Sequence, residues 1–150
     1  MICGSKSVPI NEPGQPLLTR SEVWGGLVLK AHNGMPFVSA MSKCVVVAKY
    51  GETSFDREVR IRDEDFRERV TMDEPHRVVF ARLSGPVLGT ITNEIIGDDD
   101  DLKLCFSFAM VVSGVPGGSD AEREFGENMA NDFMKGSIGT RDVIRRIAVG

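Results

Sequence analysis

The feature that most constrains this chain is a run of six strand-like segments joined only by short polar connections. Each segment is rich in β-branched or aromatic residues, and several alternate apolar with polar side chains, which is typical of strands with one buried face. Connections as short as GET, RDED and GDDDD join antiparallel neighbours rather than parallel strands. The segments are residues 44–50, 54–61, 66–72, 77–83, 88–96 and 102–112. The sequence therefore predicts an antiparallel sheet built by successive hairpins.

The residues before this run predict one more strand and two short helices. A strand is expected near residues 3–8. Thr19 and Glu22 have the spacing of a capping box, so a helix should begin there. A second short helix is predicted over residues 36–41, because Pro36 suits the first turn of a helix. The first helix should bury the apolar stripe Val23, Trp24, Leu27 and Val28.

The last part of the chain predicts one long helix. Ser119 and Glu122 repeat the capping-box spacing, and the helical pattern continues over residues 120–148, a length of roughly 40 Å. Gly136 and Gly139 interrupt this pattern, so we expect either a bend where the helix crosses the sheet or a hinge that admits a ligand. Phe125, Met129 and Phe133 should face the sheet. Strands followed by a packed helix predict an α+β fold.

The composition is that of an ordinary globular protein. The chain has 150 residues, of which 41% are apolar and 27% charged, and its formal net charge is −4. This length suits a single domain spanning residues 1–150. The acidic balance disfavours a nucleic-acid partner, and the absence of a long apolar run disfavours a membrane span or a secretory signal. We therefore expect a cytoplasmic protein without nucleic-acid or membrane partners.

The cysteines and histidines do not predict a metal or cofactor site. Cys3, Cys44 and Cys105 lie far apart without a CxxC pair, which is typical of reduced thiols. His32 and His76 are the only histidines, and they have no neighbouring cysteines with the spacing of a zinc site. We therefore expect neither a metal nor a cofactor.

Pairing the central strands through their turns predicts which side chains face inward. The SGPV turn sets Phe80 opposite Ile91, and the GDDDD turn sets Ile91 opposite Phe108. One face is then almost entirely apolar, whereas Glu94 lies on the other face among threonines. A register shifted by one residue would mix the two faces, so this register is favoured. The inward face reads Val78, Phe80, Ile91, Asn93, Ile95, Leu104, Phe106 and Phe108.

Several polar side chains are predicted to share the inward face. Asn93 lies in an apolar wall, where an unpaired amide costs about 1–3 kcal/mol. Arg82 continues the same face near its rim, and Arg69 should also point inward if the DEPH turn is regular. Arg57 is left open, because a bulge in its strand would decide whether Arg57 or Glu58 faces the interior.

This polar group has two interpretations. In the first, it is a cluster of ion pairs and hydrogen bonds that satisfies itself, since buried charges are usually paired. In the second, it orients a ligand oxygen in an apolar cavity: Arg69 stabilises an enolate or carboxylate, and Asn93 binds a carbonyl. Arg69 and Asn93 are thus the candidate catalytic residues. The candidate ligand-binding residues are Trp24, Phe37, Arg57, Val78, Phe80, Arg82, Ile91, Phe106, Phe108, Met129 and Phe133. For Trp24 and Phe37, simple helix packing is the alternative to a place at the cavity mouth.

The order of these elements resembles the helix-grip fold of the START and birch-pollen-allergen superfamily, also called SRPBCC. In that fold a curved antiparallel sheet of about seven strands wraps a long C-terminal helix and leaves a cavity between them. The stretches EVWGGLVLKA, REV, RERVTM, PHRVVF and GTITNEI are similar to the AtaL-like branch of this superfamily. GSIG at residues 136–139 departs from the better helix formers usual in that branch. The resemblance covers nearly the whole chain and implies a single α+β helix-grip domain.

The resemblance implies a range of functions. Superfamily members bind apolar or polyketide-like small molecules; some are cyclases, isomerases, dehydratases or hydrolases, and others only carry or sense a ligand. The AtaL-like branch is often associated with fungal secondary-metabolite gene clusters. We therefore expect a cofactor-free cyclase, isomerase or dehydratase that binds a hydrophobic small molecule in an apolar internal cavity. The alternative is a non-catalytic carrier or sensor of a hydrophobic ligand. A homodimer formed through edge strands is compatible with either function.

Overall fold

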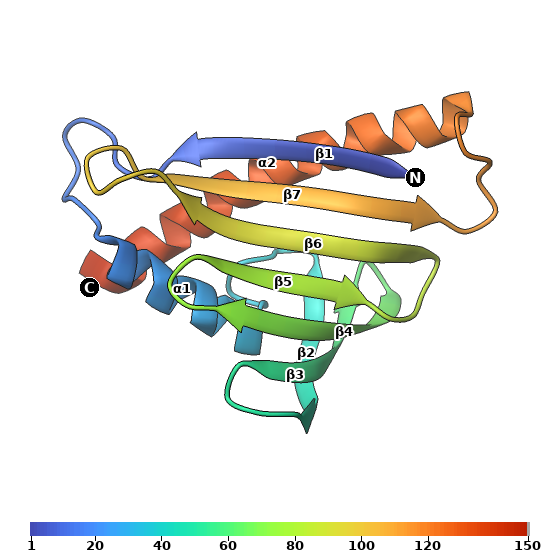
Figure 1. Ribbon diagram of the computed structural model, residues 1–150, viewed down its shortest axis with the longest axis horizontal. Coiled ribbons are helices and arrows are strands. Elements are labelled where there is room, and N and C mark those ends of the chain that lie inside the picture. Colours follow the sequence, from blue (N-terminus) through green and yellow to red (C-terminus); the bar gives the residue numbers. More distant parts are fainter. Residues whose placement is uncertain (150) are drawn as a thin grey trace.

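The computed structural model describes residues 1–149, which form one seven-stranded antiparallel sheet and two helices. The strand order across the sheet is β1-β7-β6-β5-β4-β3-β2, so the first and last strands are neighbours (Figure 1). The elements are β1 (Ile2–Pro9), α1 (Arg20–His32), β2 (Met41–Lys49), β3 (Ser54–Ile61), β4 (Glu64–Asp73), β5 (Arg77–Arg82), β6 (Val87–Ile96), β7 (Lys103–Val112) and α2 (Asp120–Val149). The predicted succession of hairpins and the long last helix are confirmed.

The sheet curves because its regular pairing is interrupted. The pairing of β2 with β3 shifts between Met41 and Lys43 and again between Val46 and Ala48, and such bulges bend a strand. In Figure 1, β2 and β3 turn away from the direction of the other strands. In β6, Gly89 has a φ of 142°, and a Cβ there would overlap the backbone of β7. The bulges and this glycine let the sheet form a concave inner face.

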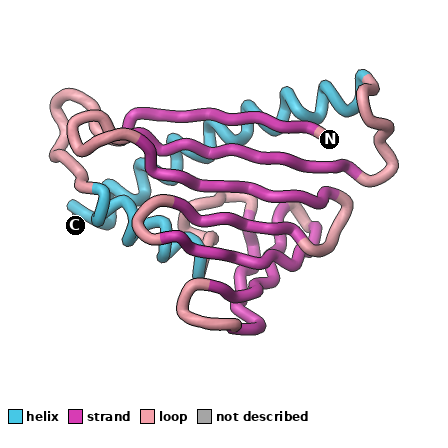
Figure 2. The backbone as a smooth tube through the Cα atoms, viewed as in Figure 1, coloured by secondary structure: helices cyan, strands magenta, loops and turns pink. Residues whose placement is uncertain are grey.

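The two helices cover different parts of the inner face. Helix α2 lies against β1 and β7 and crosses them obliquely (Figure 2). Helix α1 contacts α2 and strands β2, β5 and β6. Gly136 and Gly139 do not break α2, which is continuous over its 30 residues. Neither helix within the described part of the chain combines the length and the apolar character needed to cross a membrane.

The two predicted helix starts differ in their capping. At α1, the backbone N–H of Glu22 donates to Thr19 Oγ1 at 3.2 Å, and the backbone N–H of Thr19 donates to Glu22 Oε1 at 3.0 Å. The predicted capping box is therefore complete. At α2, Ser119 Oγ accepts from the backbone N–H of Glu122 at 3.2 Å, but the Glu122 carboxylate accepts from Gly118 instead of Ser119. Only half of the second capping box forms.

The prediction of a second short helix over residues 36–41 is wrong. This segment forms turns, in which the backbone N–H groups of Phe37 and Val38 both donate to the Gly34 carbonyl, at 3.0 and 2.9 Å. Phe37 and Met41 are buried in apolar cores, and Met41 already begins β2. Too few residues are left for a helical turn to propagate, because starting a helix is costly.

The predicted register of the central hairpins is confirmed. Phe80 pairs with Ile91, Val78 pairs with Asn93, and Ile91 pairs with Phe108. Val78, Phe80 and Phe108 are buried, as expected for the inward face. This register holds Asn93 on the inner face of β6, in the middle of the apolar wall.

Candidate functional site

Three charged side chains meet on the inner face of β3, β4 and β5. The register places Arg57 opposite Glu68, and Glu68 opposite Arg82. Arg57 Nε and Nη2 donate to Glu68 Oε1 at 3.0 and 2.9 Å, and Arg82 Nε donates to Glu68 Oε2 at 3.4 Å. The three side chains are only 3–11% exposed. One buried carboxylate therefore neutralises one of two buried guanidinium groups.

Arg57 also fixes the end of α1 against the sheet. Its Nη1 donates to the backbone carbonyls of Lys30 and Ala31 at 3.0 and 2.9 Å. These carbonyls lie in the last turn of α1, where backbone oxygens lack partners within the helix and a cation is favoured. The bulged pairing of β2 and β3 resolves the open question for this strand, because Arg57 and not Glu58 faces inward.

Lys30 extends from α1 into the same interior. Its Nζ donates to Asn93 Oδ1 at 2.6 Å and lies 4.3 Å from the centre of the Phe106 ring and 5.7 Å from that of Phe80. Burial above all, and then the nearby charge of Arg57, lower the pKa of Lys30 to about 7, although Glu68 partly opposes this shift. Near neutral pH, Lys30 is therefore divided between its protonated and neutral forms. Together, Lys30, Arg57, Glu68, Arg82 and Asn93 form what we call the inner cluster.

Asn93 contributes a polar atom that has no partner. The residue is 1% exposed, and among the described residues nothing accepts a hydrogen bond from its Nδ2. In the structure Lys30 Nζ donates to Oδ1, which leaves Nδ2 as the unpartnered atom of the amide. An unsatisfied buried donor costs about 1–3 kcal/mol, so this one calls for an explanation.

The aromatic residues predicted to bind a ligand fall into two groups. Phe80, Phe106 and Phe108 line the inner face and are buried, as is Val78. Trp24 of α1 and Phe37 of the following turn are buried in the same main apolar core as Val78, Phe80 and Phe106. Their positions are those of packed core side chains.

The contact between α2 and the central strands is not fully closed. Phe133 of α2 makes edge-on ring contacts with Phe108 and Phe106, with ring centres 4.9 and 6.5 Å apart. Met129 packs beside it, and Ile91 faces them from β6. Phe133, Met129 and Ile91 all keep partial exposure, so solvent reaches this side of the inner face.

The prediction that Arg69 points inward is wrong. Val70, not Arg69, pairs with Phe80, because only three residues separate the paired Asp73 and Arg77 at the DEPH turn. Regular four-residue spacing would have shifted the register by one residue, and such a shift reverses every side chain. Arg69 therefore lies on the outer face, with its side chain 46% exposed.

On the outer face Arg69 belongs to a second ionic group. Its Nε donates to Asp56 Oδ1 at 2.9 Å, and Arg67 Nε and Tyr50 Oη donate to Asp56 Oδ2 at 3.1 and 2.8 Å. These bonds, that from Arg69 above all, lower the pKa of Asp56 to about 2 against the opposing effect of burial. We call Tyr50, Asp56, Arg67 and Arg69 the outer cluster.

Two members of the inner cluster were not singled out from the sequence. Lys30 stands three residues after Leu27 and seven after Val23, so it falls on the apolar stripe of α1. Glu68 alternates with Phe66 and Val70, which are both buried on the inner face of β4. In each case a charge at an apolar position was the available signal.

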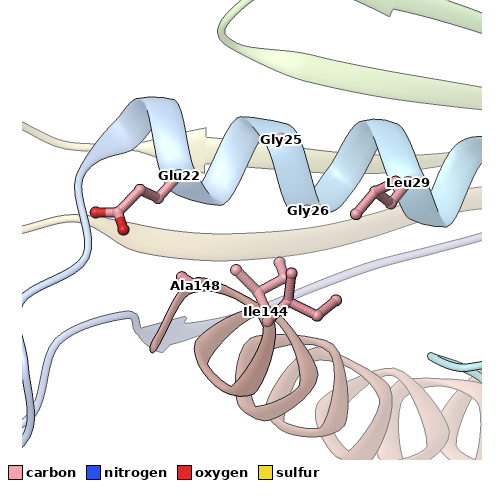
Figure 3. A pocket seen from close by; sticks show the side chains of 7 residues that line it. Glu22, Gly25, Gly26, Leu29, Ile144 and Ala148 are labelled. Atoms are coloured by element: carbon pink, nitrogen blue, oxygen red, sulfur yellow. The ribbon is translucent and has the colours of Figure 1, made fainter. Parts of the chain in front are cut away.

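A separate pocket lies at the surface where α1 crosses the end of α2 (Figure 3). It has a volume of about 230 Å³ and an apolar lining formed mainly by Gly25, Gly26, Leu29, Ile144, Ile147 and Ala148, with Glu22 beside them. The helices approach closely because a Cβ at Gly26 would overlap Ile144. This pocket is distinct from the inner cluster. Nowhere in residues 1–149 do three His, Cys, Asp or Glu side chains gather as a metal site would require.

A curved antiparallel sheet, a long C-terminal helix across its concave face and a polar cluster between them define a helix-grip protein. The chain belongs to the AtaL family: the family model described as acetylaranotin biosynthesis cluster protein L matches residues 5–150. The predicted family and fold class are therefore confirmed. No protein of curated function matches the sequence.

Solved structures of low sequence identity share the fold. The Zhui aromatase/cyclase from Streptomyces sp. R1128 is 12% identical with a TM-score of 0.70, over 97% of this chain and 92% of that one. The protein Ara h 8.0201 is 9% identical with a TM-score of 0.56, over 98% of this chain and 97% of that one. The di-domain ARO/CYC StfQ from the steffimycin biosynthetic pathway is 10% identical with a TM-score of 0.67, over 97% and 50%.

Proposed function

We propose that this protein binds an apolar small molecule through a carbonyl oxygen at the inner cluster. It then acts on that molecule as a cofactor-free enzyme of secondary metabolism, such as a cyclase, isomerase or dehydratase. The observation that carries this proposal is the unpartnered Nδ2 of Asn93, a donor held rigidly in an apolar wall. A carbonyl oxygen of a bound ligand is an acceptor that would satisfy it.

The arrangement suits chemistry in which negative charge develops on that oxygen. Lys30 Nζ is hydrogen-bonded to Oδ1 of the Asn93 amide, so a ligand carbonyl oxygen placed at Nδ2 lies close to the amine as well. In its neutral form Lys30 removes a proton from the carbon next to the carbonyl, and Asn93 stabilises the enolate oxygen. The walls of Phe80 and Phe106 keep water away, which strengthens these interactions.

The comparisons support the class of reaction. Two of the solved structures that share the fold are named as an aromatase/cyclase and as an ARO/CYC protein of a biosynthetic pathway, and the matched family takes its description from a biosynthesis cluster. The partial exposure of Ile91, Met129 and Phe133 supports access from the side of α2. A ligand there displaces the flexible side chains of Met129 and Phe133 to open the predicted internal cavity.

The first experiment is native mass spectrometry of the freshly purified protein, followed by denaturation and small-molecule analysis. A bound compound with an apolar skeleton and a carbonyl group is expected. The second experiment uses naphthyl methyl ketone as a probe. Calorimetry measures its binding, and mass spectrometry follows deuterium uptake at its methyl group in deuterium oxide.

The decisive variant is Asn93→Asp, which keeps the acceptor for Lys30 but removes the donor. We expect it to fold, to bind the ketone about tenfold more weakly or worse, and to lose deuterium exchange. Arg69→Met, on the outer face, is the control and should change neither property. Binding of the ketone without accelerated exchange would leave a carrier and reject the enzyme. No binding of the ketone by the wild type would reject the interior site.

A further inference from the structure

Lys30 is unusual among buried lysines because no carboxylate pairs with it. In residues 1–149 its Nζ makes one hydrogen bond, to the neutral amide of Asn93, and no salt bridge. The nearest acid, Glu68, is already shared between Arg57 and Arg82. A lysine that served only to balance charge would be expected to contact the acid directly.

The surroundings also disfavour a purely structural ammonium. The ring of Phe106 attracts a cation at 4.3 Å, but the Phe80 ring is already occupied by the guanidinium of Arg57 at 4.6 Å. The charged groups that face Lys30 are Arg57 of β3 and Glu68 of β4, and Arg82 of β5 lies beyond Glu68. Strands β6 and β7 present only Asn93 and Phe106 to it. Two guanidinium groups against one carboxylate favour a neutral amine.

We propose that Lys30 is a nucleophile that forms an imine with an aldehyde or ketone whose oxygen is held by Asn93. The inference rests on the proposed function and makes its substrate class narrower: a neutral, apolar aldehyde or ketone. The Asn93 amide offers Nδ2 as a donor for the carbonyl oxygen, and the Lys30 amine is hydrogen-bonded to Oδ1 of the same amide. Both groups lie within one apolar enclosure. A lysine desolvated in an apolar site beside another cation is the arrangement that activates amines for this chemistry. The depressed pKa of Lys30, about 7, is consistent with it.

The step balances without an oxidant or reductant. The neutral amine attacks the carbonyl carbon, a C–N bond forms, and the π electrons move onto oxygen, which gains a proton as nitrogen loses one. The C–O bond of this carbinolamine then breaks, water leaves after taking a proton from solvent, and the nitrogen lone pair completes the C=N bond. Amine, carbonyl compound and one proton thus yield a protonated imine and one water. The imine withdraws electrons from the neighbouring carbon and makes its C–H more acidic. Because Lys30 is then bound in the imine, solvent water, and not Lys30, takes that proton for isomerisation, cyclisation or loss of water.

The test is reductive trapping with naphthaldehyde and cyanoborohydride, read by peptide mass spectrometry. Near neutral pH, Lys30 should be alkylated at least tenfold faster than Lys43, whose side chain is 44% exposed. Lys30→Met should remove this adduct, whereas Lys43→Met should leave it unchanged. Asn93→Asp should slow it strongly, because the oxygen loses its donor and the new carboxylate beside Lys30 keeps the amine protonated. Exchange of the naphthyl methyl ketone oxygen with water labelled by heavy oxygen should depend on Lys30 in the same way.

Binding of naphthalenemethanol, which cannot form an imine, separates this inference from the proposed function. If the alcohol binds but Lys30 is trapped no faster than Lys43 and the ketone oxygen does not exchange, the imine is rejected and the binding site stands. If neither the alcohol nor the ketone binds, the proposed interior site itself is rejected. Lys30→Met is expected to fold, because an apolar side chain replaces a buried amine that has no carboxylate partner, and its thermal unfolding checks this.

Discussion

The inner and outer clusters meet back to back on opposite faces of β3 and β4, and the inner cluster extends from there to Arg82 of β5. Each has one carboxylate shared by two arginines: Glu68 by Arg57 and Arg82 inside, and Asp56 by Arg67 and Arg69 outside. Consecutive residues on β3, Asp56 and Arg57, contribute one member to each. In both clusters a guanidinium also lies over an aromatic ring.

The clusters differ in their access to water. The arginines of the outer cluster are 42% and 46% exposed, and no buried polar atom of this cluster lacks a hydrogen-bond partner. The arginines of the inner cluster are 5% and 11% exposed, and it contains an additional amine and an unused amide donor. Ion pairing alone therefore does not mark a functional site. Of the two clusters, only the inner one has spare hydrogen-bonding capacity in a dry environment, and this property supports its proposed role.

The largest predicted difference comes from removing the shared carboxylate. Glu68→Gln leaves Arg57, Arg82 and Lys30 without a buried counter-charge, and we expect a loss of about 3–5 kcal/mol in the free energy of unfolding. Asp56→Asn leaves arginines that water can solvate, and we expect a loss of about 1 kcal/mol. Urea unfolding at neutral pH measures both. Equal losses would show that the two faces are electrostatically alike and would contradict the difference that we infer between the two clusters.

The second difference concerns the response to alkaline pH. Burial lowers the folded-state pKa of Lys30 to about 7 from 10.5, so the unfolded chain binds the extra proton between these values. The free energy of unfolding should therefore rise as pH increases from 7 to 9, by at most about 1.4 kcal/mol per pH unit. Lys30→Met should flatten this rise, whereas Lys43→Met should retain it. A wild-type profile without the rise would mean that Lys30 keeps an ordinary pKa.

The inner cluster could be predicted only in part, and the reasons are local. Asn93 and Phe80 were placed correctly because the turns that follow and precede β6 join strands whose apolar residues alternate cleanly. Arg69 was misplaced because the turn before β5 pairs Asp73 with Arg77, a detail that the alternation in β4 does not reveal. Arg57 depended on bulges, which sequence patterns do not locate.

Lys30 could not be predicted as a site residue by pairing arguments, because it comes from a helix. Its contact with Asn93 joins residues 63 positions apart and depends on how α1 crosses the sheet. The curvature that brings α1 to β5 and β6 arises from the bulges of β2 and from Gly89. The order of elements was predictable from turns and periodicity, whereas the meeting of helix and sheet required the three-dimensional curvature.

The third prediction concerns how much the outer cluster stabilises the fold at acidic pH. The Asp56 carboxylate has a folded-state pKa of about 2, below its unfolded value of 3.8. Its stabilising contribution is therefore complete above about pH 4 and is lost as pH falls toward 2. Because Arg67 and Arg69 are partly solvated, we expect this contribution to be only about 1 kcal/mol. Subtracting the acid unfolding profile of Asp56→Asn from that of the wild type isolates it, and a constant difference down to pH 2 would contradict the assignment.

The smallest predicted effect is that of Tyr50→Phe. This change removes the hydroxyl that donates to Asp56 Oδ2 at 2.8 Å but keeps the ring beneath Arg69. Because Tyr50 is 56% exposed, we expect a loss of only about 0.5 kcal/mol at neutral pH, together with a rise in the pKa of Asp56. Binding of naphthyl methyl ketone should not change. A change in that binding would show that Asp56 and its neighbour Arg57 couple the two faces through β3, and the clusters would then have to be treated as one site.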